Sequence, residues 1–211
     1  MAEAPRDFRE LVERLGGHPA GELGIELSAK GGPERWFVAA CVLAERAPRR
    51  SGLAAVRALA RAGLAEPRDL AKAGPDAVFA VLAEANHPRA EPLAHRLARA
   101  GTRLTERHGG TFDALAAECE DLEALGGCIA ALASGVGRAT VLRFLRPLRD
   151  RWSAAAEVPL DPAARRAAVE LGWLAEGNDE EGAPFSLQAR LADEPDPPSL
   201  ADAETALARL R

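Results

Sequence analysis

The sequence predicts an all-α protein built from two helical subdomains. Apolar residues recur at the spacing of helices along most of the 211 residues, and no segment keeps the alternating pattern of a strand. Glycine and proline interrupt these helical segments at 16–17, 31–33, 74–75, 109–110 and 195–198. An apolar content of 47% is enough to build a full hydrophobic core, as one large or two small domains.

In the first half of the chain, these interruptions bound the expected helices. The segment 6–15 ends before paired glycines, and 34–46 begins after the Gly-Gly-Pro at 31–33. The glycine and proline at 74–75 divide one apolar stretch into two helices. We expect helices at 6–15, 34–46, 52–62, 67–73, 76–85 and 91–107, the last ending before the glycines at 109–110.

Helical periodicity continues through the second half of the chain. We expect helices at 112–118, 122–132, 138–152, 162–171, 185–191 and 200–210. The first and last helices of the whole chain, 6–15 and 200–210, are both amphipathic, so each needs a partner for its apolar face. We therefore expect the N-terminal helix to pack on the C-terminal helices.

The turn Gly-Val-Gly at 135–137, between two expected helices, is typical of a helix-hairpin-helix. Glycine reaches positive φ at little cost and leaves backbone N–H groups uncovered at a helix N-terminus, where the helix dipole favours a phosphate. Five arginines and one acid lie between Arg138 and Arg151. The alternative interpretation is a simple connecting turn followed by a solvated helix face.

Charge is unevenly distributed along the chain. The formal net charge is −5, but nine acidic residues and one basic residue lie between Glu176 and Glu204. The rest of the chain is modestly basic and can present a phosphate-binding face. Because 25 of the 27 basic residues are arginine, the number of arginines in one segment is by itself weak support for that face.

Three cysteines at wide spacing, Cys41, Cys119 and Cys128, match neither a disulfide framework nor a zinc or iron–sulfur ligand set. We therefore expect core thiols, no metal and no cofactor. No apolar stretch approaches about twenty residues, and the first residues hold no apolar signal core. These features predict a soluble, cytoplasmic protein that does not contact the membrane, and we expect it to be a monomer.

From residue 33 to residue 173, the order of the motifs resembles the endonuclease III-like superfamily of helix-hairpin-helix DNA glycosylases. Residues 33–44 resemble the first barrel helix of that family, which ends in a loop that wedges into DNA. The glycines at 109–110 stand where the family has a short turn before the hairpin. The Val-Pro-Leu-Asp at 158–161 is similar to the segment that supplies the catalytic carboxylate.

The resemblance implies an endonuclease III-like division of the chain. Residues 33–146 would form a six-helix, barrel-like domain with the helix-hairpin-helix at about 122–151. Residues 147–211 would complete a second subdomain, together with the N-terminal helix in 1–32.

The resemblance also implies base-excision repair of double-stranded DNA, with the protein bound to the nucleoid when it engages DNA. Asp161 would be the catalytic carboxylate that supports hydrolysis of the N-glycosidic bond of a damaged or mismatched base. Bifunctional members carry a lysine two residues after the hairpin, where this chain has Ala139, so the resemblance implies a monofunctional glycosylase without lyase activity. The four-cysteine iron–sulfur motif of some members is absent from the sequence.

The residues expected to contact DNA come from the hairpin and from two other loops. They are Gly135, Val136, Gly137, Arg138, Thr140, Glu45, Arg46, Arg49 and Arg89. Glu45 stands where the family often has a glutamine that fills the gap left by the flipped base, and phosphates would repel its carboxylate. Three interpretations stay open here: Arg46, Arg49 and Arg50 partly compensate for that charge, Arg46 is the wedge, or the segment is a simple solvated loop between helices.

Other interpretations of the same residues stay open. Asp161 before Pro162 is also a standard helix N-cap with proline at the first helical position. A noncatalytic DNA-binding relative with a decayed pocket would account for Glu45 and Ala139. A helical protein-interaction domain without a nucleic-acid role would account for the net charge of −5.

Overall fold

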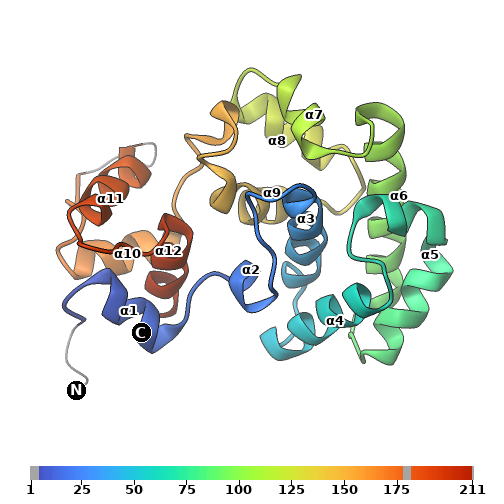
Figure 1. Cartoon of the computed structure of the whole chain (residues 1–211), viewed down its shortest axis with the longest axis horizontal. Helices are drawn as coiled ribbons and strands as arrows, with labels where there is room; N and C mark the ends of the chain where they lie inside the picture. The colour runs from blue at the N-terminus through green and yellow to red at the C-terminus, as the bar shows by residue number, and fades with distance from the viewer. Residues whose placement is uncertain (1–4, 178–181, 211) are drawn as a thin grey trace. The chain divides into compact units, whose positions relative to one another are not determined.

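The computed structural model describes residues 5–177 and 182–210, and within them every regular element is a helix (Figure 1). The all-α prediction is confirmed. The chain divides into two compact units, a smaller one formed by Met1–Glu22 with Glu157–Arg211 and a larger one formed by Leu23–Ala156.

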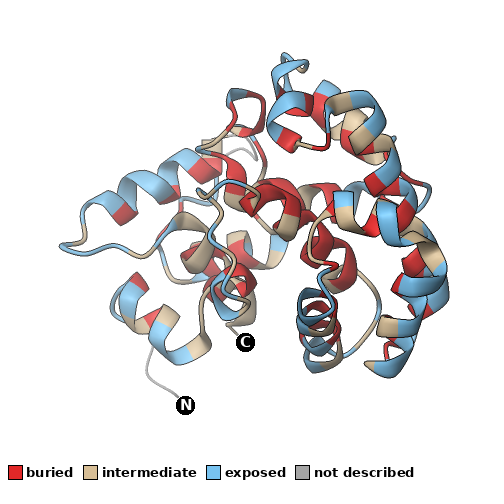
Figure 2. Ribbon diagram, turned by 45° about the vertical axis from the view of Figure 1, so that its right-hand side comes forward, coloured by how far each residue is buried: buried red, intermediate tan, exposed pale blue. Residues whose placement is uncertain are grey.

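The larger unit is built around α3 (Gly32–Leu43), which α4, α6 and α9 contact (Figure 1). Ten of the twelve residues of α3 are buried, and Figure 2 shows this helix as largely red. The other elements of the unit are α4 (Arg49–Arg61), α5 (Pro67–Glu84), α6 (Ala90–His108), α7 (Phe112–Ala117), α8 (Leu122–Ala130) and α9 (Arg138–Leu145), then the 3-10 turns η1 (Arg146–Leu148) and η2 (Ser153–Ala155).

An aromatic cluster holds α3, α7 and α9 together. The ring of Phe112 lies 4.8 Å from that of Phe37 and 4.6 Å from that of Phe144, between ring centroids. The indole N–H of Trp36, which is fully buried, donates to the carbonyl oxygen of Phe144 at 3.0 Å. These contacts fix the C-terminal end of α9 relative to α3, since large aromatic side chains bury much area where they pack together.

Several expected helix boundaries differ from the observed ones by up to three residues, and two differences are larger. The expected helix 138–152 ends at Leu145 and continues as the 3-10 turn η1, because Pro147 lacks the N–H that a longer α-helix would need. The two helices expected at 67–73 and 76–85 form one element, α5, broken inside by Gly74, whose φ is 77° and ψ is 168°. The break lies at the expected glycine and proline.

The smaller unit contains α1 (Phe8–Leu15), α2 (Pro19–Glu22), α10 (Pro162–Glu170), α11 (Gly182–Ala192) and α12 (Leu200–Arg209). Its core joins Phe8 and Leu11 of α1 to Ala164, Ala168 and Leu207 of α10 and α12. The short helix α2 has no counterpart among the expected helices, because four residues are too few to form a periodic pattern.

The units divide after Glu22 and Ala156, whereas the sequence places the boundaries at 32/33 and 146/147. Residues 23–32 and 147–156 thus belong to the larger unit, where a contact between distant parts of the sequence joins them. The guanidinium of Arg151 donates to the carbonyl oxygens of Leu27 and Ser28, at 3.4 and 3.3 Å.

Candidate nucleic-acid interface

Residues 131–137 form the turn between α8 and α9. Gly135 has φ 89°, a left-handed conformation that favours glycine, whereas Gly137 has φ −91° and ψ 175°, which any residue adopts. Val136 lies between them with 4% of its surface exposed and anchors the turn in the core. Both glycines are exposed, so the turn presents bare backbone on each side of one apolar anchor.

Helix α9 begins directly after this turn, and no side chain of the described residues caps its N-terminus. Gly137, Arg138 and Ala139 at its start are all exposed. Thr140 is buried, so its side chain packs inward and only its backbone belongs to this end of the helix. Helix N-termini of this kind present N–H groups and the positive end of the helix dipole to solvent.

The arginine run that follows the hairpin does not form one solvated face. Arg149 is buried and donates to the carbonyl oxygen of Arg146 at 3.0 Å. Arg151 makes a two-bond ion pair with Asp113, at 2.8 and 2.7 Å, and hydrogen bonding to Arg151 lowers the pKa of that carboxyl. Of these arginines, Arg138 is the exposed one at the turn itself.

Glu45 follows α3 and is only 10% exposed, because two arginines enclose its carboxylate. Arg96 of α6 donates a hydrogen bond to it, and Arg89, just before α6, forms an ion pair with it at 3.3 Å. The structure therefore brings together two of the expected DNA-contacting residues, Glu45 and Arg89. The charge of Glu45 is offset by Arg89 and Arg96.

Arg96 also connects this ion pair to the turn at 131–137. A Cβ atom built on Gly135 would lie 2.7 Å from Nε of Arg96, so the guanidinium occupies the space that a side chain at 135 would need. Arg96 was not among the expected site residues. The available signal was the spacing of Arg96, Arg99 and Arg103, which places three arginines along one stripe of α6.

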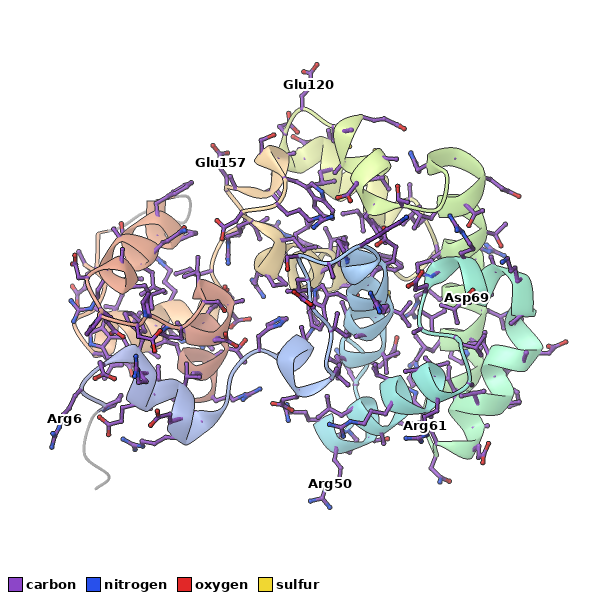
Figure 3. All side chains as sticks on the ribbon, viewed as in Figure 1. Arg6, Arg50, Arg61, Asp69, Glu120 and Glu157 are labelled. Atoms are coloured by element: carbon purple, nitrogen blue, oxygen red, sulfur yellow. The ribbon has the colours of Figure 1, made fainter. Side chains whose placement is uncertain are left out.

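The remaining expected DNA contacts lie at the start of α4. Arg46 and Arg49 are exposed, with Arg49 the first residue of that helix. Arg50, the next residue, extends outward from α4 in Figure 3. The loop before α4 is thus basic at its surface, while Glu45 at its beginning is enclosed.

His87 lies two residues before Arg89 and is buried, with 4% of its surface exposed. Its Nδ1 accepts from the backbone N–H of Arg89 at 3.3 Å, and its Nε2 is buried without a hydrogen-bond partner. Burial lowers the pKa of His87, and the charge of Glu45 opposes that shift. Burial also raises the pKa of the nearby Cys41 thiol to about 12, so the thiol stays protonated at neutral pH.

The lowered pKa of His87 predicts a pH-dependent stability. The unfolded chain binds the proton more readily, so His87 contributes its full share to the free energy of unfolding only above the ordinary histidine pKa of 6.5. That contribution is lost as the pH falls toward the lower pKa of the folded state. Replacing His87 by Asn, whose carbonyl can still accept from the N–H of Arg89, should flatten that decline. Urea unfolding at a series of pH values from about 7.5 to 5 measures it.

The control for this prediction is His95→Asn, at an exposed histidine of α6. This variant removes an exposed histidine and leaves the buried His87 in place. Equal pH dependence in His87→Asn and the parent would show that another group carries the effect.

Asp161, the expected catalytic residue, belongs to the smaller unit, whereas the turn between α8 and α9 belongs to the larger one. It is the N-cap of α10, and its Oδ1 accepts from the N–H of Ala163 at 2.9 Å. Its own N–H donates to the buried carboxylate of Glu204 at 2.6 Å. The capping role is therefore observed, and Glu204 fixes the backbone at this position.

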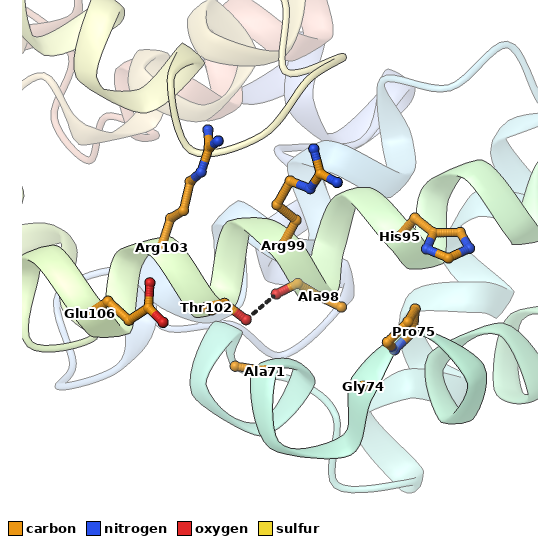
Figure 4. Close-up of a pocket in the computed structure, with 9 residues that line it drawn as sticks. All are labelled: Ala71, Gly74, Pro75, His95, Ala98, Arg99, Thr102, Arg103 and Glu106. Atoms are coloured by element: carbon orange, nitrogen blue, oxygen red, sulfur yellow. Dashed lines mark hydrogen bonds between the residues drawn. The ribbon is translucent and has the colours of Figure 1, made fainter.

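A cavity of about 410 Å³ lies between α5 and α6, beside the break at Gly74 (Figure 4). Its lining combines small residues of α5 with mostly polar residues of α6, namely Ala71, Gly74, Pro75, His95, Ala98, Arg99, Thr102, Arg103 and Glu106. The sequence predicts the break in α5 but not the cavity, because the cavity depends on how closely α6 approaches the broken helix.

No family model matches the chain, and no curated protein matches it significantly. The resemblance to the endonuclease III-like superfamily therefore depends on the motifs quoted above. Within the described residues, no cluster of three or more histidine, cysteine or acidic side chains can hold a metal ion. No helix in the same residues is both long and apolar enough to cross a membrane.

Proposed function

We propose that the chain binds the phosphate backbone of double-stranded DNA through residues 131–137 and the start of α9. The observation that carries the proposal is the uncapped, exposed N-terminus of α9. The two preceding helices, α7 and α8, are each capped by a side chain, from Thr111 and Asp121 respectively, whereas α3 to α6 lack such a cap, as α9 does. At α9 a glycine stands in the cap position, which leaves N–H groups and the helix dipole available to an anion.

The distribution of charge between the units supports this proposal. The larger unit, Leu23–Ala156, contains 19 basic and 15 acidic residues, and the smaller unit contains 8 basic and 17 acidic residues. The net charge of −5 therefore comes from the smaller unit, while the unit that holds the hairpin is basic. A basic unit of this kind attracts a polyanion despite the acidic whole.

The finer proposal is that the chain is a monofunctional DNA glycosylase in which Asp161 supports cleavage of the N-glycosidic bond. Its support is the motif order and the exposed Ala139 at the lysine position of bifunctional relatives. In this proposal the protein acts as a cytoplasmic monomer that associates with the nucleoid when bound to DNA. The second candidate is a noncatalytic DNA-binding protein, and the observed use of Asp161 as a helix cap favours it.

Gly137→Asp tests the DNA-binding proposal. The backbone at 137 suits any residue, and a Cβ there would meet nothing within 4 Å, so the variant should fold normally. The new carboxylate would lie where a phosphate approaches, and we expect affinity for a short duplex to fall by about tenfold or more at low salt. Fluorescence anisotropy across a salt series measures the change.

Two controls separate charge from bulk. Gly137→Ala adds a side chain without a charge and without an oxygen that could cap the helix, so it should retain most of the affinity. Gly21→Asp adds the same charge at an open position of α2 in the smaller unit. Equal affinity of Gly137→Asp and the parent at every salt concentration would remove the hairpin from the binding surface.

A further inference from the structure

Helix α6 supports the hairpin turn at two points through arginines. Nη1 of Arg103 donates a hydrogen bond to the carbonyl oxygen of Ala131, at the beginning of the turn. The guanidinium of Arg96 lies against Gly135, near the end of the turn. The turn is therefore held along α6 by two cations that lie seven residues apart on one stripe of the helix.

Arg99 lies between these two arginines and is exposed. In Figure 4 the guanidinium groups of Arg99 and Arg103 extend on the same side of α6, opposite Ala71 of α5. Throughout residues 5–177 and 182–210, Arg99 has neither an ion pair nor a side-chain hydrogen bond. The side chain is thus free on the flank of α6 that carries the turn.

The charges around Arg99 favour an anion at this place. Its neighbours one helical turn away are His95, Arg96, Thr102 and Arg103, and none of them is acidic. Glu45 offsets the charge of Arg96, but Arg103 donates to a neutral carbonyl. Two like charges four residues apart repel each other on a helix, so a bound anion would relieve the repulsion between Arg99 and Arg103.

We propose that Arg99 binds a phosphate of the DNA backbone beside the hairpin, so that α6 and the start of α9 form two sides of one backbone-binding site. This inference rests on the proposed binding of duplex DNA. Arg96 and Glu45 have a different role in it, because Arg96 lies against Gly135 and Glu45 pairs with Arg96. They are positioning residues that hold Gly135 in place, and Arg99 makes the contact with the phosphate.

The test is the salt dependence of duplex binding by the full chain with Arg99→Ala. Each phosphate contact contributes about 0.9 to the slope of log affinity against log salt. We expect Arg99→Ala to reduce that slope by about one and to weaken binding roughly fivefold to tenfold at about 0.1 M salt. Alanine is the best helix former, so α6 should be retained, which circular dichroism checks.

Two further variants make the result specific. Arg99→Lys keeps the charge and should restore most of the slope. Arg61→Ala removes one exposed arginine at the C-terminal end of α4 (Figure 3) and should leave the slope unchanged.

The outcomes distinguish this inference from the proposed function. If the parent chain does not bind duplex DNA, both are wrong. If the parent binds and Gly137→Asp weakens binding while Arg99→Ala has the slope of the parent, the hairpin binds DNA without α6. If inorganic phosphate at millimolar concentration shows the same dependence on Arg99 while the duplex does not, the side chain binds a free anion and the inference about DNA is overturned.

Discussion

Replacing Asp161 by Asn is expected to abolish most base release while leaving the protein folded. Asparagine is as good an N-cap as aspartate, and its carbonyl oxygen can accept from the N–H of Ala163 as Oδ1 of Asp161 does. The substitution removes the negative charge that would support an oxocarbenium-like sugar. Loss of a key electrostatic stabiliser costs roughly 10²- to 10³-fold in rate, whereas the free energy of unfolding should stay within about 0.5 kcal/mol of the parent.

The measurement is turnover on a panel of duplexes that each carry one damaged or mismatched base. Because Ala139 stands at the lysine position of bifunctional enzymes, the product strand should break only after treatment with alkali. The control is Asp7→Asn, the same change at the N-cap of α1, where the side chain accepts from the N–H of Glu10. If Asp161→Asn is as active as the parent, or if no duplex in the panel is cut, the noncatalytic DNA-binding protein becomes the better account.

Gly101→Ala is expected to destabilise the larger unit strongly. Gly101 lies in α6 at the point where that helix meets the beginning of α5, and a Cβ built on it would lie 2.0 Å from the carbonyl oxygen of Pro67. Both partners are backbone, so the two helices must separate to admit the methyl group. Overpacking of this kind costs about 3 kcal/mol in the free energy of unfolding.

Gly127→Ala is the matched control for this prediction. Gly127 lies inside α8, is exposed and has no atom within 4 Å of the added Cβ. Alanine there should stabilise the helix by up to about 1 kcal/mol, because alanine has the higher helix propensity. Chemical denaturation measures both variants, and a Gly101→Ala protein as stable as the parent would mean that α5 and α6 can slide apart at little cost.

Helical periodicity and the local chemistry of helix ends were sufficient to predict the all-α fold. Asp161 and Pro162 begin α10 as the cap and first helical residue, and Gly74 interrupts α5 at the expected place. These features involve residues within one or two turns of each other, which is the range over which a sequence can be interpreted by itself. The end of α9 and the short helix α2 were missed, because the first depends on one proline within an apolar pattern and the second is too short to show a period.

The environment of Glu45 was decided by tertiary structure. Arg96 lies 51 residues away in sequence, and no local pattern pairs the two side chains. In the sequence, the only arginines near Glu45 are those of its own loop; in the folded unit its carboxylate is enclosed by Arg89 and Arg96. The same packing sets Arg96 against Gly135 and leaves Arg99 exposed on the flank of the hairpin.

The arginines that follow the turn at 131–137 show the same difference between what the sequence determines and what the tertiary structure decides. The sequence by itself determined that the segment is basic and that a glycine turn precedes a helix. Only the tertiary structure decided that Arg151 forms an ion pair with Asp113 and that Arg149 is buried, while Arg138 stays at the surface. The reason is physical: helix formation depends on neighbours along the chain, whereas the partner of a charge depends on which segments the folded core brings within a few ångströms of it.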